Sequence, residues 1–298
     1  MSFLTTRNPR DTLQRMTDGA EFLVRAQNSD GGWGYRVGGM SYVQPTAAAL
    51  LAFADPNRAA CGRARDFLLS LQHADGGWGI AAIDDESGWM TAWAMLGLTA
   101  FPDAQVAVAN GASWLLASEG TRVTDPAARA QAQQMFRIDS TLRGWPWQTY
   151  DAAWVHPTAL AILALVSAGR SDHARIRQGV EYLLDRAVQS GGWNVGNPQM
   201  IDKPVPATIQ DTAIALLALR AVGRTRDEPR IAQGLEFLQR AVAAVKTPAE
   251  LAWGAYALGE WNAQTGDARA RLNELQRVDG SWQMNPFITA TAILANRI

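Results

Sequence analysis

Cysteine is almost absent from this chain of 298 residues, which contains one, Cys61. A single cysteine excludes an internal disulfide framework and suits a reducing, cytoplasmic compartment. Basic blocks are also missing, and the formal net charge is −1, so nucleic acid is not expected as a partner. The first ten residues lack the apolar segment of a secretory signal. We therefore expect a cytoplasmic protein.

Long apolar runs are missing too. None approaches the roughly 20 residues that a membrane-spanning helix needs. We therefore expect no transmembrane segment, while a peripheral membrane contact and a protein partner both stay open. The chain is long enough to bury a sizeable core in one large domain.

Tryptophan, in contrast, is abundant, with 12 copies, and three of them end near-identical segments at residues 27–33, 72–78 and 276–282. Each segment runs from Gln to Trp and contains Asp-Gly-Gly or Asp-Gly-Ser, which stops a helix. We call it a staple. Its tryptophan is expected to fold back over the helix end, and its glutamine to bond the open carbonyls of the last helical turn. Shortened or altered copies end at Trp193 and at residues 145–147. A repeated staple predicts a repeated architecture.

Helical periodicity appears in six pairs, each an amphipathic run followed by a largely apolar one. A helix that is apolar all round must be buried on every side, so the apolar helices should form an inner ring inside the amphipathic ones. The amphipathic runs are residues 11–27, 58–72, 106–118, 174–189, 230–245 and 268–276. The apolar runs are residues 45–53, 89–98, 154–165, 208–219, 248–260 and 287–294.

This pattern predicts an all-α fold, an (α/α)6 barrel, in one domain over residues 1–298 with a central cavity. An open solenoid is the alternative, but its ends would carry polar caps, and the last helix is as apolar as the middle ones. An insertion at residues 119–147 contains a short helix near residues 127–136. Whether it covers the barrel mouth is left undecided by the sequence.

The staple followed by a helix that starts with Thr-Ala resembles the repeat of squalene–hopene cyclases and related class II terpene cyclases. Protein prenyltransferase β subunits share that toroid. The resemblance covers essentially the whole chain, although hopene cyclases carry two such barrels and this chain is about one barrel long. The Thr-Ala helix starts are at Thr46, Thr91, Thr158, Thr212 and Thr289.

The residues that these families use for chemistry are only partly present. Prenyltransferases bind zinc through an Asp-x-Cys pair and a distant His, but Cys61 has no Asp two residues before it, which argues against that site. Class II cyclases use Asp-x-Asp-Asp-Thr-Ala, which matches Thr-Ile-Gln-Asp-Thr-Ala at residues 208–213. Only the last aspartate is kept, as Asp211. Gln210 takes the place of the family's proton donor, and an amide cannot donate that proton.

Asp211 and His156 start neighbouring inner helices and are the predicted catalytic pair. Asp211 as a helix-capping acid and His156 as a buried, hydrogen-bonded residue are the structural alternatives. Residues at or near the starts of the inner helices are predicted to bind the substrate, with π faces that favour a carbocation, or else to pack in the core. They are Trp89, Trp93, Tyr150, Trp154, Gln210, Trp253, Tyr256 and Phe287.

Asp84 and Asp85 belong to the densest acidic cluster. They are predicted to hold Mg²⁺ if the substrate is a diphosphate, or else to be solvated loop residues. No other cofactor is expected.

The preferred hypothesis is a terpene cyclase-like enzyme, an isomerase or lyase that acts on an isoprenoid or other apolar small molecule. A non-catalytic module that binds a hydrophobic ligand or a protein is the alternative. A polysaccharide hydrolase or lyase using Asp84, Asp151 and Asp211 is a lesser one.

Overall fold

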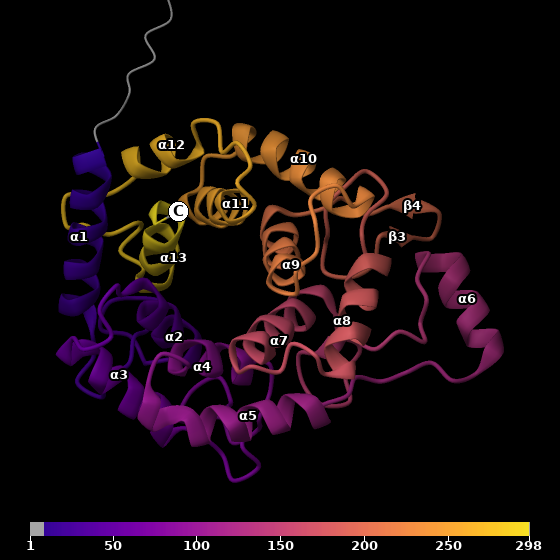
Figure 1. The fold of residues 1–298 in the computed structure, drawn as a ribbon, viewed down its shortest axis with the longest axis horizontal. Coiled ribbons are helices and arrows are strands. Elements are labelled where there is room, and N and C mark those ends of the chain that lie inside the picture. The colour runs from indigo at the N-terminus through magenta and orange to yellow at the C-terminus, as the bar shows by residue number, and fades with distance from the viewer. Residues whose placement is uncertain (1–8, 298) are drawn as a thin grey trace, which may run out of the picture.

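The structure, a computed structural model, describes residues 9–297 as two concentric rings of helices (Figure 1). The outer ring contains α1 (Pro9–Ala26), α3 (Ala59–Ser70), α5 (Gln105–Ala117), α8 (Ala174–Asp185), α10 (Pro229–Ala244) and α12 (Ala268–Glu274). The inner ring contains α2 (Val43–Ala52), α4 (Met90–Leu98), α7 (Val155–Ser167), α9 (Ile209–Ala221), α11 (Pro248–Glu260) and α13 (Pro286–Asn296).

The rings close. Helix α13 packs against both α11 and α2, and α1 packs against α13. The predicted all-α barrel is confirmed, and the open solenoid is wrong. Within residues 9–297, no helix combines the length and the apolar character that crossing a bilayer requires.

Five tryptophans join the two rings. The indole N–H of each donates to a leucine carbonyl of an outer helix at 2.6–2.8 Å. The backbone N–H of each donates to a threonine hydroxyl of an inner helix at 2.8–3.0 Å. The trios are Trp33 with Leu23 and Thr46, Trp78 with Leu68 and Thr91, Trp145 with Leu115 and Thr158, Trp193 with Leu183 and Thr212, and Trp282 with Leu272 and Thr289. The threonine of each Thr-Ala helix start is therefore the acceptor that fixes the inner helix.

The prediction for the staple glutamine is wrong. Instead of bonding the last turn of its own helix, the Gln27 amide donates to the Gly31 carbonyl at 2.7 Å and to the Ala60 carbonyl of α3 at 2.8 Å. Last-turn carbonyls are already used by backbone N–H groups, as where Leu71 donates to Leu68. The glutamine is thus free to tie neighbouring hairpins together. Gln72 bonds Ala107 in the same way, and Gln276 bonds Arg15 across the closure of the ring.

Tryptophan rings of the staples also need space on an adjacent outer helix, as two glycines show. A Cβ added to Gly179 of α8 would lie 2.6 Å from the Trp145 ring, and one added to Gly234 of α10 would lie 2.6 Å from the Trp193 ring. Glycine inside a helix costs about 0.8–1 kcal/mol relative to alanine. These glycines are tolerated because any larger residue would collide with an indole.

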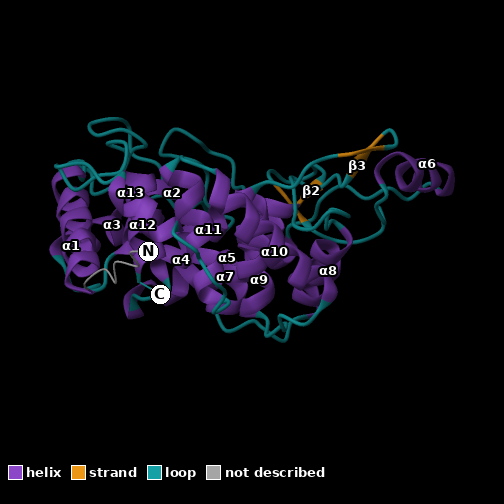
Figure 2. Ribbon diagram, turned by 90° about the horizontal axis from the view of Figure 1, so that it is seen from above, coloured by secondary structure: helices purple, strands orange, loops and turns teal. Residues whose placement is uncertain are grey.

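The helical part of the insertion lies outside the rings rather than over their centre (Figures 1 and 2). Its helix α6 (Pro126–Phe136) sits at the edge of the molecule beside the hairpin of β3 (Gln199–Met200) and β4 (Lys203–Pro204), as Figures 1 and 2 show. The backbone N–H of Ile201 donates to the Met135 carbonyl at 3.0 Å. Helix α6 therefore leaves the barrel mouth uncovered.

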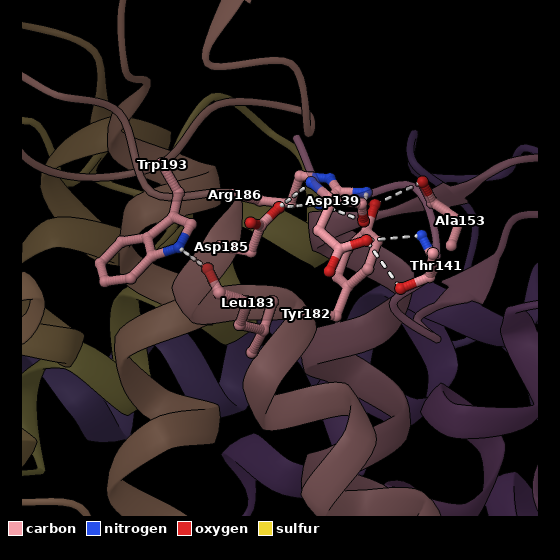
Figure 3. A network of polar contacts seen from close by, with 8 residues as sticks. All are labelled: Asp139, Thr141, Ala153, Tyr182, Leu183, Asp185, Arg186 and Trp193. Carbon is pink, nitrogen blue, oxygen red and sulfur yellow. Dashed lines mark hydrogen bonds and ion pairs between the residues drawn. The ribbon is translucent and has the colours of Figure 1, made fainter. Parts of the chain in front are cut away.

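A buried polar network fastens the end of the insertion to α8 (Figure 3). The Arg186 guanidinium pairs with Asp185, donates to the Asp139 carbonyl at 3.4 Å and lies 4.3 Å from the centre of the Tyr182 ring. The Tyr182 hydroxyl donates to the Ala153 carbonyl at 2.5 Å. Ala153 belongs to β2 (Ala153–Trp154), which pairs with β1 (Trp145–Pro146). The network thereby holds the segment that leads into α7.

We predict that Gly179→Ala destabilises the fold by about 1–3 kcal/mol, because the new methyl group overpacks against Trp145. The matched control is Gly62→Ala in α3, where nothing lies within 4 Å of the added Cβ. Gly62→Ala should stabilise by up to about 1 kcal/mol through helix propensity. Urea unfolding measures both variants, and equal effects would contradict the role given to the glycine.

Acid should weaken the staples. A hydrogen bond from the Ser281 hydroxyl at 2.7 Å, joined by one from the Ser281 backbone N–H at 3.0 Å, holds the pKa of Asp279 below its ordinary value. Because the folded pKa is the lower one, this stabilisation is complete above about pH 4, the unfolded value, and is lost as the pH falls through the folded value. We expect Asp279→Asn to be less stable than wild type at pH 7 and to lose less free energy of unfolding between pH 5 and pH 2. The control Asp151→Asn, in an exposed loop, should follow wild type.

Candidate functional site

A pocket of about 470 Å³ opens at the amino-terminal ends of the inner helices, and we call it the amino-terminal pocket. Five of its lining residues share one position, two residues before the threonine that accepts from a staple tryptophan. The five are Gln44, Trp89, His156, Gln210 and Phe287, and the pocket is completed by Trp147, Thr208, Ile209, Asp211 and Glu250. The staple register thus decides which side chains face the mouth.

The predicted pair lies together in this pocket. The His156 Nδ1 atom is 3.6 Å from Asp211 Oδ1, and His156 is 5% exposed. The other imidazole nitrogen, Nε2, is buried and has no hydrogen-bond partner. Asp211 also bonds the N-cap residue of its helix, since its Oδ2 accepts from the Thr208 hydroxyl at 2.8 Å and its backbone N–H donates to Thr208 Oγ1 at 3.1 Å. Thr208 therefore caps α9, and the carboxylate that accepts from its hydroxyl also faces His156.

Two indoles enclose the imidazole. The Trp147 ring stacks on His156 with centroids 5.4 Å apart and an interplanar angle of 26°. Trp89 meets the same imidazole edge-on at 5.7 Å, and the two indoles lie edge-on at 4.5 Å. A backbone hydrogen bond of 3.0 Å from Trp89 N to the Trp147 carbonyl fixes the pair. This box shields His156 from water and presents π faces that attract a cationic ligand.

A second carboxylate, Glu250, shares the pocket. Its Oε2 accepts from the Thr247 hydroxyl at 2.5 Å, so residues 247–250 repeat on α11 the threonine–acid contact that residues 208–211 form on α9. The sequence analysis missed Glu250, although this repeated Thr-x-x-acid pattern is a signal that could have found it. It also missed Gln44, which the threonine register identifies. The Tyr35 hydroxyl donates to Gln44 Oε1 at 2.5 Å, and burial raises the pKa of Tyr35 to about 12, so the hydroxyl keeps its proton at neutral pH.

The other predicted substrate-binding residues divide into two groups. Trp93, Trp253 and Tyr256 lie one to two turns deeper and line a second pocket. Tyr150 is 85% exposed, with a φ of 74°, and does not line the amino-terminal pocket. Trp154 is half-buried in β2, with its ring against the backbone of Gly196, and does not line that pocket either.

The loop that contains Asp84 and Asp85 is closed by hydrogen bonds between the Asp84 carboxylate and the loop's own backbone. The Asp84 carboxylate accepts from the backbone N–H of Ile80 at 2.7 Å and of Glu86 at 3.3 Å, while Asp85 is exposed. Across residues 9–297, no group of three or more His, Cys, Asp or Glu side chains could hold a metal ion. These donors do not fit a Mg²⁺ site, so the magnesium hypothesis gains no support from the geometry. Neither Asp84 nor Asp151 lines the pocket of Asp211, which leaves the polysaccharide hypothesis equally unsupported.

Cys61 is buried, and its burial raises the pKa of the thiol to about 11, against the opposing effect of Arg58. A buried thiol of this kind is not the thiolate that binds zinc.

Comparisons with known proteins agree with this picture. The family model of the squalene-hopene cyclase C-terminal domain matches residues 1–127. The squalene–hopene cyclase of Zymomonas mobilis is 25% identical over 226 residues, which are 70% of this chain and 34% of that enzyme. The squalene–hopene cyclase of Alicyclobacillus acidocaldarius is 29% identical over 133 residues, which are 41% of this chain and 21% of that enzyme. The chain therefore matches about a third of these relatives' length or less.

A solved structure has the same fold. It is a variant of the type II terpene cyclase MstE from Scytonema in complex with geranylgeranyl dihydroxybenzoate, its substrate. The TM-score is 0.68 at 16% identity, with 97% of each chain covered. Together these comparisons confirm the predicted resemblance to the toroid superfamily of terpenoid cyclases and protein prenyltransferases.

The aromatic box and the two carboxylates predict a preference for cations. We expect decyltrimethylammonium, below its micelle concentration, to bind more tightly than decanol, by up to roughly 30-fold if the head group is desolvated against the indoles. Isothermal titration calorimetry measures the ratio. Trp147→Leu and Glu250→Gln should each lower it, whereas Glu86→Gln, in the exposed loop, should not. A ratio of one in wild type would contradict the prediction.

Proposed function

We propose that this chain, whose fold is the α/α toroid of the terpenoid cyclase and protein prenyltransferase superfamily, is an enzyme that isomerises or cyclises an isoprenoid or other apolar substrate in its amino-terminal pocket. The observation that carries the proposal is the buried His156, enclosed by two indoles and 3.6 Å from Asp211. The relatives support it, because squalene–hopene cyclases match the sequence and a type II terpene cyclase has the same fold.

The chemistry follows from which acid is present. Gln210 stands where the resembling cyclases carry their proton donor, so protonation of a plain alkene by a carboxylic acid lacks its usual group. An imidazolium is a weaker acid than a carboxylic acid, and it protonates an oxygen atom more readily than an alkene carbon. We therefore favour a substrate with an oxygen at the reacting carbon, such as an epoxide.

In the proposed sequence, His156 Nε2 donates its proton to the epoxide oxygen while Asp211 holds the imidazolium through Nδ1. The carbon–oxygen bond breaks, both of its electrons go to the oxygen, and the carbon is left cationic. The π faces of Trp89 and Trp147 stabilise that charge. A nearby double bond attacks the cation, and Glu250 then takes a proton from the carbon beside the new cation to form an alkene. One proton enters and one leaves, so the net reaction is an isomerisation.

The non-catalytic alternative rests on the same Gln210. A pocket that has lost its proton donor and kept its aromatic walls suits the retention of an apolar ligand without turnover. In that case the ligand would be recovered unchanged.

The test is incubation with prenyl alcohols, prenyl diphosphates, squalene and terminal epoxides of prenyl chains, followed by mass spectrometry. We expect isomeric products from the epoxides. Asp211→Asn and His156→Ala should each lower kcat by about 10²–10⁴-fold, the contribution of one acid–base group. Asp211→Asn keeps an acceptor for Thr208, so the cap of α9 survives.

Asp151→Asn, an acid in an exposed loop, serves as the control and should turn over like wild type. Full turnover in both pocket variants would refute the roles of Asp211 and His156. Stoichiometric binding of a substrate with no product in any arm would favour the binding module.

A further inference from the structure

The inner helices enclose a second pocket, of about 250 Å³, at their carboxyl-terminal ends, and we call it the carboxy-terminal pocket. Its lining residues, like those of the first pocket, lie at a constant spacing from the staple threonines. Leu51, Leu96, Leu163, Leu217 and Leu294 each lie five residues after the threonine of their helix, and all five line it. Seven residues of helix separate this layer from the His156 layer, a distance of about 10 Å along the axis.

Aromatic side chains lie between the two pockets. The Trp93 ring contacts the Trp253 ring at 6.5 Å and the Phe287 ring at 5.8 Å, both nearly edge-on. Phe287 lines the amino-terminal pocket, whereas Trp93 and Trp253 line the carboxy-terminal one. The second pocket is therefore a separate compartment.

The wall of this compartment is apolar and uncharged. Leucines and tryptophans dominate it, and no Asp, Glu, Lys, Arg or His lines it. An engineered cavity of about 150 Å³ with walls of this kind stays dry and binds benzene. A pocket of about 250 Å³ has room for a compact apolar molecule larger than a benzene ring.

The buried indole N–H of Trp93, in the wall, lacks an acceptor. Trp93 is 3% exposed, and its indole N–H has no hydrogen-bond partner. The Thr291 hydroxyl already donates to the Ile288 carbonyl at 2.9 Å. Burial raises the pKa of the Tyr256 hydroxyl to about 12, so that group also stays a donor at neutral pH. A buried N–H without a partner is costly, and a ligand oxygen would satisfy it.

We propose that the carboxy-terminal pocket is a second binding site, for a neutral, compact hydrocarbon that carries one acceptor oxygen. The hydrocarbon fills the leucine ring, and the oxygen accepts from the indole N–H of Trp93. The site is independent of the proposed reaction, because it shares no lining residue with the pocket of His156 and Asp211.

The test compares camphor, a compact bicyclic ketone, with bornane, the same skeleton without the oxygen. Equilibrium dialysis with gas chromatography measures both Kd values on the full chain. We expect camphor to bind about tenfold more tightly, as one hydrogen bond to a buried donor predicts. Trp93→Phe keeps an aromatic ring and removes the N–H, so it should abolish or reverse the advantage of camphor, because its carbonyl would then be buried without a donor.

Leu96→Trp narrows the pocket from a half-buried position and should weaken both ligands at least tenfold. Leu294→Phe is the substitute if Leu96→Trp fails to fold by circular dichroism. Asp211→Asn and Trp147→Leu, in the other pocket, should leave both Kd values unchanged.

Three results would overturn the proposal. They are no binding of camphor, binding that persists in the narrowed variants, and binding that falls in the Trp147→Leu variant, which would place the ligand in the amino-terminal pocket. Equal affinities of wild type for camphor and bornane would remove the role of the indole N–H. None of these results bears on turnover, so this site and the proposed reaction can fail separately.

Discussion

Five of the six hairpins of this barrel depend on one buried tryptophan that makes two hydrogen bonds. The indole N–H reaches an outer helix, and the backbone N–H reaches a threonine of an inner helix. Both donors are buried, so losing either acceptor would leave a desolvated N–H, which costs more than an average hydrogen bond contributes. The apolar helices carry few directional groups of their own, and burial alone would let them rotate about their axes. The tryptophan–threonine bond removes that freedom.

Fixing the rotation of the inner helices also fixes what faces the barrel axis. Residues two before the threonine reach the amino-terminal mouth, and residues five after it reach the opposite one. Within this register the repeat tolerates very different side chains, since Gln44, Trp89, His156, Gln210 and Phe287 are equivalent by position. The scaffold and the chemistry are therefore separable. The staples fix the positions of the helices. On each of the five inner helices with a staple threonine, one residue at the barrel mouth varies without disturbing the fold.

The fold was predictable because its signals are local and repeated. The staples and the apolar runs lie within single hairpins, and closure followed from the apolar last helix. The meeting of His156 and Asp211 was predictable for the same reason, since both start inner helices. The place of Trp147 in the pocket was not predictable, because this residue comes from an irregular insertion. Contacts such as that between Arg186 and Asp139 hold the insertion, and no spacing in the sequence reveals them.

Other errors came from reading proximity in sequence as proximity in space. Tyr150 stands five residues before α7, yet its positive φ belongs to a turn that leaves it in solvent. The staple glutamines were assigned to their own helices, whereas they bond the neighbouring outer helix, a contact between hairpins. Gln44 was missed although it follows the register, because the register's meaning depends on knowing that the threonine accepts from the staple tryptophan. Glu250 was missed because α11 has no such threonine and only the repeated Thr-x-x-acid pattern marks it.

The position of Asp211 bears directly on how the pocket works. Its carboxylate lies in the first turn of α9, where the helix dipole and the Thr208 hydroxyl both favour a negative charge. A carboxylate held in this way faces the His156 imidazole and can orient it. Where the resembling cyclases use a chain of aspartates, this chain has Gln210 and a histidine on the adjacent helix. Under the proposed function, the acid–base role moves one helix around the ring, from the Gln210 position on α9 to His156 on α7. A pocket that combines such a pair with two indoles is suited, under the proposed function, to substrates that a mild acid can activate.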